Sequence, residues 1–169
     1  SDSKGYYKLG TINDAKSILL TYFGTDKSAT YALLGKYEMP RPLRPGDKLL
    51  LELRVQGNRL TGLVNGTAVI DAQDDRLTAA GEWGIHAKDG WYESVEVQPL
   101  PAAAPALPES GWKPLFTEAE WKSTNAAAGR ESLNGVLHLT NNSWRRPQPS
   151  PDGAVRARVK AHSAGRATA

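Results

Sequence analysis

The sequence predicts an all-β protein in which two antiparallel sheets pack as a sandwich, and three observations support this prediction. Apolar and polar residues alternate along many short segments, which is the period of a strand with one buried face. The chain contains 16 glycines and 11 prolines, which suits many turns between short strands. About a dozen strands and no long amphipathic helix can be recognised, which is typical of a sandwich.

The clearest strands lie near the middle of the chain, in LLLELRVQGNRLTGLVNGTAVID at residues 49–71. Apolar side chains occupy every second position of residues 49–55, and only Leu50 breaks the polar side. Gly57-Asn58 ends this run, and Asn65-Gly66 ends the next one. Asn-Gly supplies the two positive-φ residues of a type I′ turn. We therefore expect a meander of three strands joined by two hairpins.

The remaining elements are expected on both sides of this meander. A proline-rich loop at residues 40–46 precedes it, and residues 117–120 carry a capping box that favours one helical turn. Arginine and lysine alternate with small apolar residues along residues 155–160, which is most simply the solvated side of a strand. We expect further strands at residues 6–9, 18–23, 29–37, 93–98 and 155–161.

Length and composition restrict the class of protein. A chain of 169 residues is expected to fold as one domain with a substantial core. Because it has no cysteine, disulfides and thiolate metal sites are excluded. A net charge of +3 is too weak to indicate nucleic acid binding. No apolar stretch is long enough to insert in a membrane, and we expect any export signal to lie outside this sequence.

A low-complexity segment, PLPAAAPALPESG at residues 99–111, divides the chain. Proline and alanine without periodicity favour an extended, semi-stiff linker. Residues 1–98 carry GNRLT, VNG, AGEWGI and VEV, and residues 112–169 carry WKPLF, GVLHL and AVRARV. The first set resembles the C-terminal half of a concanavalin A-like (LamG-type) jelly-roll domain, and the second set resembles its N-terminal half. The comparison extends to bacterial 3-keto-disaccharide hydrolase-like domains.

The two halves stand in the reverse of the order usual in that family. The resemblance therefore implies a jelly-roll that is circularly permuted, or one cut from tandem repeats, with residues 99–111 bridging the original termini. Either closure within one chain, giving a monomer, or exchange of halves between two chains is compatible with this order. We favour closure within one chain, because a linker of this length can span a sandwich edge at about 3.1 Å per residue.

His86 and Glu93 are the candidate catalytic residues, because histidine is the usual general base and a nearby carboxylate could assist it. His86 ends a predicted strand just before a loop at residues 88–91. The sequence has no HExxH motif and no two histidines at metal-ligand spacing, so a catalytic zinc is not expected. An enzyme interpretation rests on the family resemblance alone.

Aromatic residues provide a second candidate site, because the C–H faces of sugars stack on aromatic rings. Trp91 and Tyr92 follow Gly90 in a predicted loop, and Trp144 and Arg145 precede a proline. These four residues are the candidate ligand-binding residues. The family's recurring core tryptophans match Trp83, Trp112 and Trp121, which we interpret as packing residues.

The only acidic cluster is DAQDD, which contains Asp71, Asp74 and Asp75. Its oxygen ligands could bind Ca²⁺, although a solvated turn after a strand is the simpler interpretation. We expect no cofactor.

The leading functional hypothesis is a non-catalytic module that binds glycans or a protein partner at a bacterial surface, in an extracellular or periplasmic location. A glycoside-cleaving enzyme of the 3-keto-disaccharide hydrolase type is the first alternative. A structural repeat of a larger exported protein is the second.

Overall fold

A computed structural model describes residues 5–11, 16–25, 31–77, 79, 81–100, 112–114, 122–123, 129–133, 136–147 and 153–160. For residues 87–90, 114, 122–123, 129–133, 136–147 and 160, only the path of the backbone is described. The predicted helical turn at residues 117–120 lies outside these ranges.

Within the described residues the chain contains strands and no helix, so the prediction of an all-β protein is confirmed. The strands are β1 (Gly5–Thr11), β2 (Ser17–Gly24), β3 (Tyr31–Glu38), β4 (Lys48–Gln56), β5 (Arg59–Val64), β6 (Thr67–Gln73), β7 (Glu82–Pro99), β8 (Lys113–Pro114), β9 (Lys122–Ser123), β10 (Gly129–Leu133), β11 (Val136–Pro147) and β12 (Gly153–Lys160).

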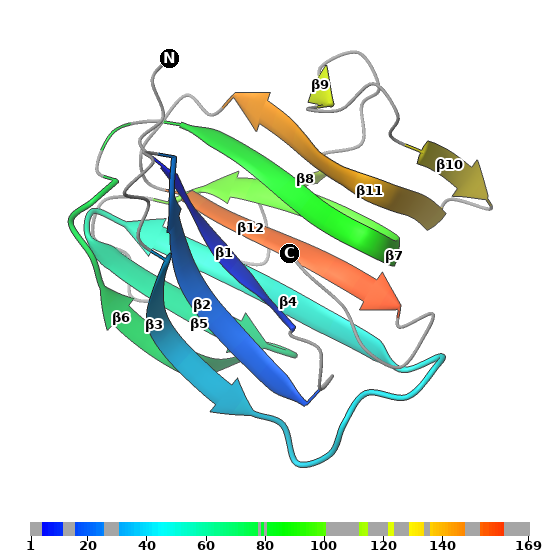
Figure 1. The fold of residues 1–169 in the computed structure, drawn as a ribbon, viewed down its shortest axis with the longest axis horizontal. Helices are drawn as coiled ribbons and strands as arrows, with labels where there is room; N and C mark the ends of the chain where they lie inside the picture. Colours follow the sequence, from blue (N-terminus) through cyan, green and yellow to red (C-terminus); the bar gives the residue numbers. More distant parts are fainter. Residues whose placement is uncertain are drawn as a thin grey trace.

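These strands form two antiparallel sheets that pack face to face (Figure 1). The small sheet has the order β1-β2-β3, and the large sheet follows the path β10-β11-β7-β12-β4-β5-β6. Strand β8 pairs with β7, and β9 pairs with β11. The small sheet, blue in Figure 1, lies over the part of the large sheet that includes β4, β5 and β12. The predicted β-sandwich is therefore confirmed.

The core lies between the two sheets, and both sheets contribute to it. Leu9, Ile18 and Leu20 of the small sheet have no exposed surface. Leu51 and Ala157 of the large sheet are equally buried and belong to the same cluster. The alternation along β4 and β12 directs these side chains to one face of the large sheet. Burial of this continuous apolar layer is the main stabilising contribution to the sandwich.

The central meander forms as the sequence predicts, with β4, β5 and β6 paired in series. Asn65 and Gly66 have φ values of 50° and 82°, as a type I′ turn requires. At the first hairpin Gly57 has a φ of 56°, whereas Asn58 is not in the positive-φ region. That pattern is the one expected of a type II′ turn. Both hairpins are thus confirmed, with different turn types.

Strand β12 connects the two parts of the chain on either side of the proline-rich segment. It pairs with β4 along one edge and with β7 along the other. Val155, Ala157 and Val159 are buried, while Arg158 is exposed. The apolar side of the predicted alternation is therefore confirmed, but the opposite side is not fully solvated, because the Arg156 side chain is only 18% exposed. Strand β12 lies between two strands that precede the linker.

Two glycines allow the small sheet to approach the large one closely. A Cβ atom on Gly62 of β5 would lie 2.9 Å from Leu9 Cδ1 of β1. A Cβ atom on Gly35 of β3 would lie still closer to Ile70 Cγ2 of β6. Ordinary contacts to a Cβ atom are longer than this, so a larger residue would force one sheet away from the other.

Candidate functional site

The predicted loop at residues 88–91 is instead part of β7, which continues from residue 82 to residue 99. The Tyr92 hydroxyl donates to the carbonyl oxygen of His86, over 3.3 Å. In a straight strand six residues span about 20 Å, far beyond the reach of a tyrosine. Strand β7 is therefore strongly bent between His86 and Tyr92. The sequence prediction missed this continuity because Asp89-Gly90 is a strong local turn signal.

The two candidate catalytic residues both lie on β7. The His86 side chain is exposed. The Glu93 carboxylate lies 2.6 Å from Nζ of Lys48, the first residue of β4. Glu93 also falls where the register between β7 and β12 shifts, because Arg158 pairs with Ser94 and Val159 with Tyr92. This geometry gives Glu93 a role in joining two strands of the large sheet.

The prediction that the Trp91 and Tyr92 rings are both exposed is wrong for Tyr92. Its side chain has no exposed surface, and it belongs to the core cluster between the sheets. A sugar cannot stack on a ring buried in this way. Trp91 is half-buried, so part of its surface remains accessible. The alternation of β7 explains the difference, because neighbouring residues point to opposite faces.

Trp144 and Arg145 lie on β11, where their backbones pair with Ile85 and Gly84 of β7. Their side chains lie outside the described residues. The adjacent pair Ser143 and His86 places this part of β11 beside the histidine. Trp91 is farther along β7 and pairs with His138.

A solvated turn is the expected role of this acidic cluster, with calcium binding as the alternative, but the Asp74 side chain is buried and the three carboxylates have different partners. Asp71 forms two hydrogen bonds with Arg59, of 2.9 and 2.7 Å. Asp75 accepts a hydrogen bond from Asn58, while Asp74 is held by Tyr7 and Arg76. Among the described residues no group of three histidine or acidic side chains could hold a metal ion. The Arg59 guanidinium holds the pKa of Asp71 below its ordinary value.

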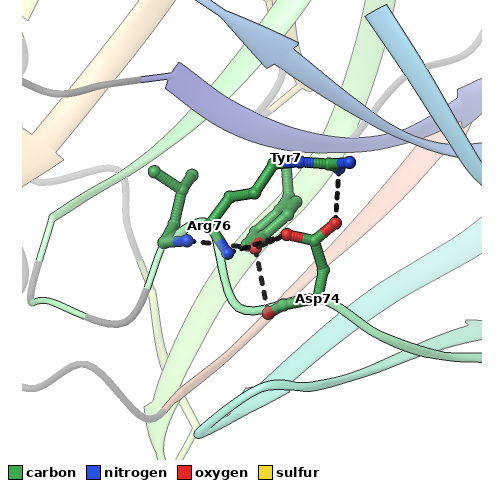
Figure 2. A network of polar contacts seen from close by, with 4 residues as sticks. Tyr7, Asp74 and Arg76 are labelled. Carbon is green, nitrogen blue, oxygen red and sulfur yellow. Dashed lines mark hydrogen bonds and ion pairs between the residues drawn. The ribbon is translucent and has the colours of Figure 1, made fainter. Parts of the chain in front are cut away.

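Asp74 instead belongs to a polar network that joins β1 to the segment after β6 (Figure 2). The Tyr7 hydroxyl donates to Asp74 Oδ1 over 2.9 Å and accepts the Leu77 N–H over 3.3 Å. Arg76 donates to both Asp74 carboxylate oxygens, through its backbone N–H and its Nη1. The Arg76 guanidinium also lies 4.9 Å from the centre of the Tyr22 ring. Burial raises the pKa of Tyr7, and the bond to Asp74 raises it further.

A second network crosses the large sheet on the face opposite to the core. Arg156 of β12 pairs in register with Glu96 of β7 and with Glu52 of β4. Its Nε donates to Glu96, and Trp112 lies over its guanidinium at 4.2 Å. The Glu52 carboxylate is almost fully buried and accepts from Arg54 Nε over 2.5 Å. Opposite charges are matched along this row, which favours a structural role.

The outer face of the small sheet carries a feature that the sequence did not indicate. Tyr6, Phe23 and Tyr31 lie side by side on β1, β2 and β3, because Tyr6 pairs with Phe23 and Phe23 with Tyr31. We call these three residues the aromatic row. The Tyr6 and Phe23 rings are stacked with centroids 5.1 Å apart, and the Phe23 and Tyr31 rings meet edge to face at 5.3 Å.

The aromatic row is open to solvent. Tyr6 is 45% exposed and Tyr31 is 57% exposed, and Leu33 beside them is 52% exposed. Among the described residues these are the large hydrophobic side chains that are exposed, and they gather at one end of one sheet. Exposed apolar groups that cluster in this way indicate an interaction site, whereas scattered ones do not. The row is therefore the candidate binding site.

Sequence reasoning missed the aromatic row because its members lie far apart along the chain. One signal was present in β1, where Tyr6 and Leu9 fall on opposite faces of a single strand. Such a strand has apolar groups on both sides, so one side must face something other than the core. The partners of Tyr6 depend on the register of β1, β2 and β3.

The fold and this site define the chain as a β-sandwich with an exposed aromatic row. No protein-family model matches the sequence, and no curated protein matches it either. In the part of the chain that the structure describes, no helix is long and apolar enough to cross a membrane.

Proposed function

We propose that the chain is a non-catalytic module that binds glycans through the outer face of its small sheet. The observation that carries this proposal is the aromatic row, with Tyr6 and Tyr31 both largely exposed. Aromatic rings offer a large apolar surface at low entropic cost, and their hydroxyls can bond to polar groups of the ligand. Both properties suit sugars, which have apolar C–H faces bordered by hydroxyl groups.

The orientation of the rings determines where a sugar can stack. One face of the Tyr6 ring is covered by Phe23, so the opposite face is the one available to a ligand. That face is directed toward the edge of the small sheet, because β1 is its terminal strand. The Tyr31 ring is inclined by 71° to the Phe23 ring. The row therefore offers two differently oriented surfaces, which suits a bent or helical oligosaccharide.

The same proposal includes the detailed topology of the fold and the location of the protein. The family resemblance supports a permuted, concanavalin A-like jelly-roll, and the position of β12 between β4 and β7 suits closure within one chain. A glycan-binding module of this kind would act outside the cell or in the periplasm, at a bacterial surface. The pairing of Glu93 with Lys48 favours a binding module over an enzyme that uses this carboxylate.

The test compares the wild type with Tyr6→Ala, Tyr31→Ala and the double variant. A glycan array identifies the ligands, and calorimetry measures their dissociation constants. We expect each single variant to weaken binding by about two- to tenfold, since a ring contact contributes about 0.5–1.5 kcal/mol beyond its buried area. Tyr6→Leu keeps apolar bulk without the ring and is expected to weaken binding as well.

Arg158→Ala is the matched control, because it removes an exposed side chain from the large sheet. It should leave affinity unchanged. Circular dichroism and thermal unfolding of every variant show whether the sandwich is intact. The proposal fails if no glycan binds to the wild type, or if the folded double variant binds as tightly as the wild type.

A further inference from the structure

The loop between β3 and β4, MPRPLRPGD at residues 39–47, carries three prolines and two arginines, none of which belongs to the aromatic row. Figure 1 shows that the loop passes from one sheet to the other at the rim of the sandwich. Proline fixes its own φ, and it disfavours a helical conformation of the residue before it. Within residues 41–45, which we call the proline segment, these two effects act on every residue except Leu43 and favour a polyproline II conformation.

The burial of the proline segment follows the period of a polyproline II helix. Such a helix has three residues per turn, so Arg41 and Arg44 share one edge, while Pro42 and Pro45 share a second. Leu43 stands on the third edge. It is buried and belongs to the core cluster, whereas the other four residues of the segment are exposed. One edge therefore attaches the loop to the core, and the other two edges face solvent.

Hydrogen bonds to Asp47 close the loop and hold the proline segment in place. The Asp47 carboxylate accepts bonds of 2.6 and 3.1 Å from the Arg41 guanidinium and a bond of 2.8 Å from the Arg44 N–H. The Asp47 N–H donates to the Arg44 carbonyl oxygen over 3.0 Å. Gly46 has a φ of 89°, as in a type II turn with Pro45 and Gly46 at its centre. The segment is therefore ordered before a partner binds, which lowers the entropic cost of association.

The exposed edges of the segment present two proline rings and a cation. At a rise of about 3.1 Å per residue, Pro42 and Pro45 lie about 9 Å apart. Arg44 bonds to Asp47 through its backbone, and among the described residues its guanidinium has no ion-pair partner. The charge of Arg44 also acts on Asp47, but the carboxylate of Asp47 is bound to Arg41. The Arg44 guanidinium therefore remains able to contact a partner.

We propose that the proline segment is an interaction site for a protein domain whose groove is lined by aromatic side chains and bordered by a carboxylate. Proline rings pack against aromatic rings in grooves of this kind, and a preformed polyproline II segment loses little conformational entropy on binding. The carboxylate of the partner pairs with Arg44, which strengthens the complex at low salt. The aromatic row includes Tyr31 at the start of β3, whereas this loop follows the end of β3, so the proposal does not depend on the proposed function.

The test uses three purified probes with differently built aromatic grooves, an SH3, a WW and an EVH1 domain. Each domain is added to the ¹⁵N-labelled protein, and the amide shift changes identify the residues in contact. Calorimetry measures the dissociation constants of the wild type, Pro42→Ala, Pro45→Ala, the double variant and Arg44→Gln. Pro40→Ala is the matched control, because Pro40 is an exposed proline of the same loop that precedes the proline segment. Thermal unfolding shows whether each variant is folded.

We expect at least one of these domains to bind, with the largest shift changes at the non-proline amides of residues 41–46. Pro42→Ala and Pro45→Ala should each weaken binding by about tenfold, because each removes a ring from the contact. Arg44→Gln should weaken it by about two- to fivefold and reduce its dependence on salt. Pro40→Ala should leave the affinity within about twofold of the wild type.

Three results would overturn the proposal. They are binding by none of the three domains, shift changes confined to other parts of the chain, and a folded double variant that binds as tightly as the wild type. None of these results bears on the binding of glycans by the small sheet, so the two proposals fail separately.

Discussion

At the scale of single residues, Tyr7 shows how one side chain can hold distant parts of the chain together. It lies on β1, and its hydroxyl contacts Asp74 and the N–H of Leu77 beyond β6. Its ring also lies 5.9 Å from that of Tyr22 on β2. The network therefore fixes the strand that carries Tyr6 relative to the large sheet, and it supports the aromatic row indirectly.

Tyr7→Phe should lower the free energy of unfolding by about 1–3 kcal/mol, because it leaves the buried Asp74 carboxylate and the part-buried Leu77 N–H without the hydroxyl. Urea unfolding at pH 7 measures this loss. Tyr31→Phe removes a phenol hydroxyl at an exposed position and should change stability by less than about 0.5 kcal/mol. Equal effects of the two substitutions would show that the network does not stabilise the fold.

The same tyrosine should make stability depend on pH in the alkaline range. Because the pKa of Tyr7 is raised in the folded state, folding favours its neutral phenol. This contribution is complete below the ordinary tyrosine pKa of about 10, and it is lost as pH rises from there through the folded pKa. Wild type should therefore lose more stability than Tyr7→Phe between pH 9 and pH 11. Parallel pH profiles would contradict this prediction.

The sequence predicts single residues well where local pattern determines their burial. Alternation correctly places Leu51 and Leu53 in the core. It fails for Tyr92, which was expected in an exposed loop. The turn signal of Asp89-Gly90 is local, whereas the pairing of β7 with β11 and β12 arises only in the folded sheet. The pairing of β7 with its neighbouring strands, and not the local turn signal, therefore determines that Tyr92 is buried.

At the scale of elements, glycines set the distance between the two sheets at the points where a strand of one sheet lies close to a strand of the other. Gly35 of β3 lies against Ile70 of β6, which is 5% exposed and therefore has little space to move. Isoleucine is also stiff about χ1. A methyl group at position 35 must displace either the isoleucine or the whole strand.

Gly35→Ala should therefore destabilise the protein by about 1–3 kcal/mol, the usual cost of overpacking a core. Gly81→Ala is the matched control, because nothing lies within 4 Å of a Cβ atom at that position. It should leave the free energy of unfolding unchanged or slightly raise it. Thermal unfolding measures both effects. A neutral Gly35→Ala variant would show that the sheets are not in close contact there.

The hairpins of the central meander could be predicted because their signals are short-range. Asn65 accepts the Leu50 N–H through its side chain, and its own N–H donates to the Leu50 carbonyl oxygen. This pairing and the positive φ of Asn65 explain why asparagine suits that position. The aromatic row could not be predicted in this way, because it needs the register of three strands.

At the scale of the whole molecule, strands that precede the linker and strands that follow it pair in one large sheet. The sequence indicated two sheets from the number of strands and the frequency of turns. It did not indicate that β12 lies between β4 and β7, because that order depends on contacts between residues about 100 positions apart. The large sheet therefore packs against the inner face of the small one, and the exposed Tyr6 and Tyr31 lie on the opposite, outer face.

The outer face of the small sheet is the proposed ligand-binding surface, and an NMR titration shows whether the ligand binds there. The ¹⁵N-labelled protein is titrated with the tightest-binding oligosaccharide, and the amide shift changes are mapped on the strands. We predict that the largest changes occur at residues 6–8, 21–23 and 31–33. Changes confined to residues 85–92 and 143–145 would instead place the site around His86 and Trp144, and would exclude the outer face as the binding surface.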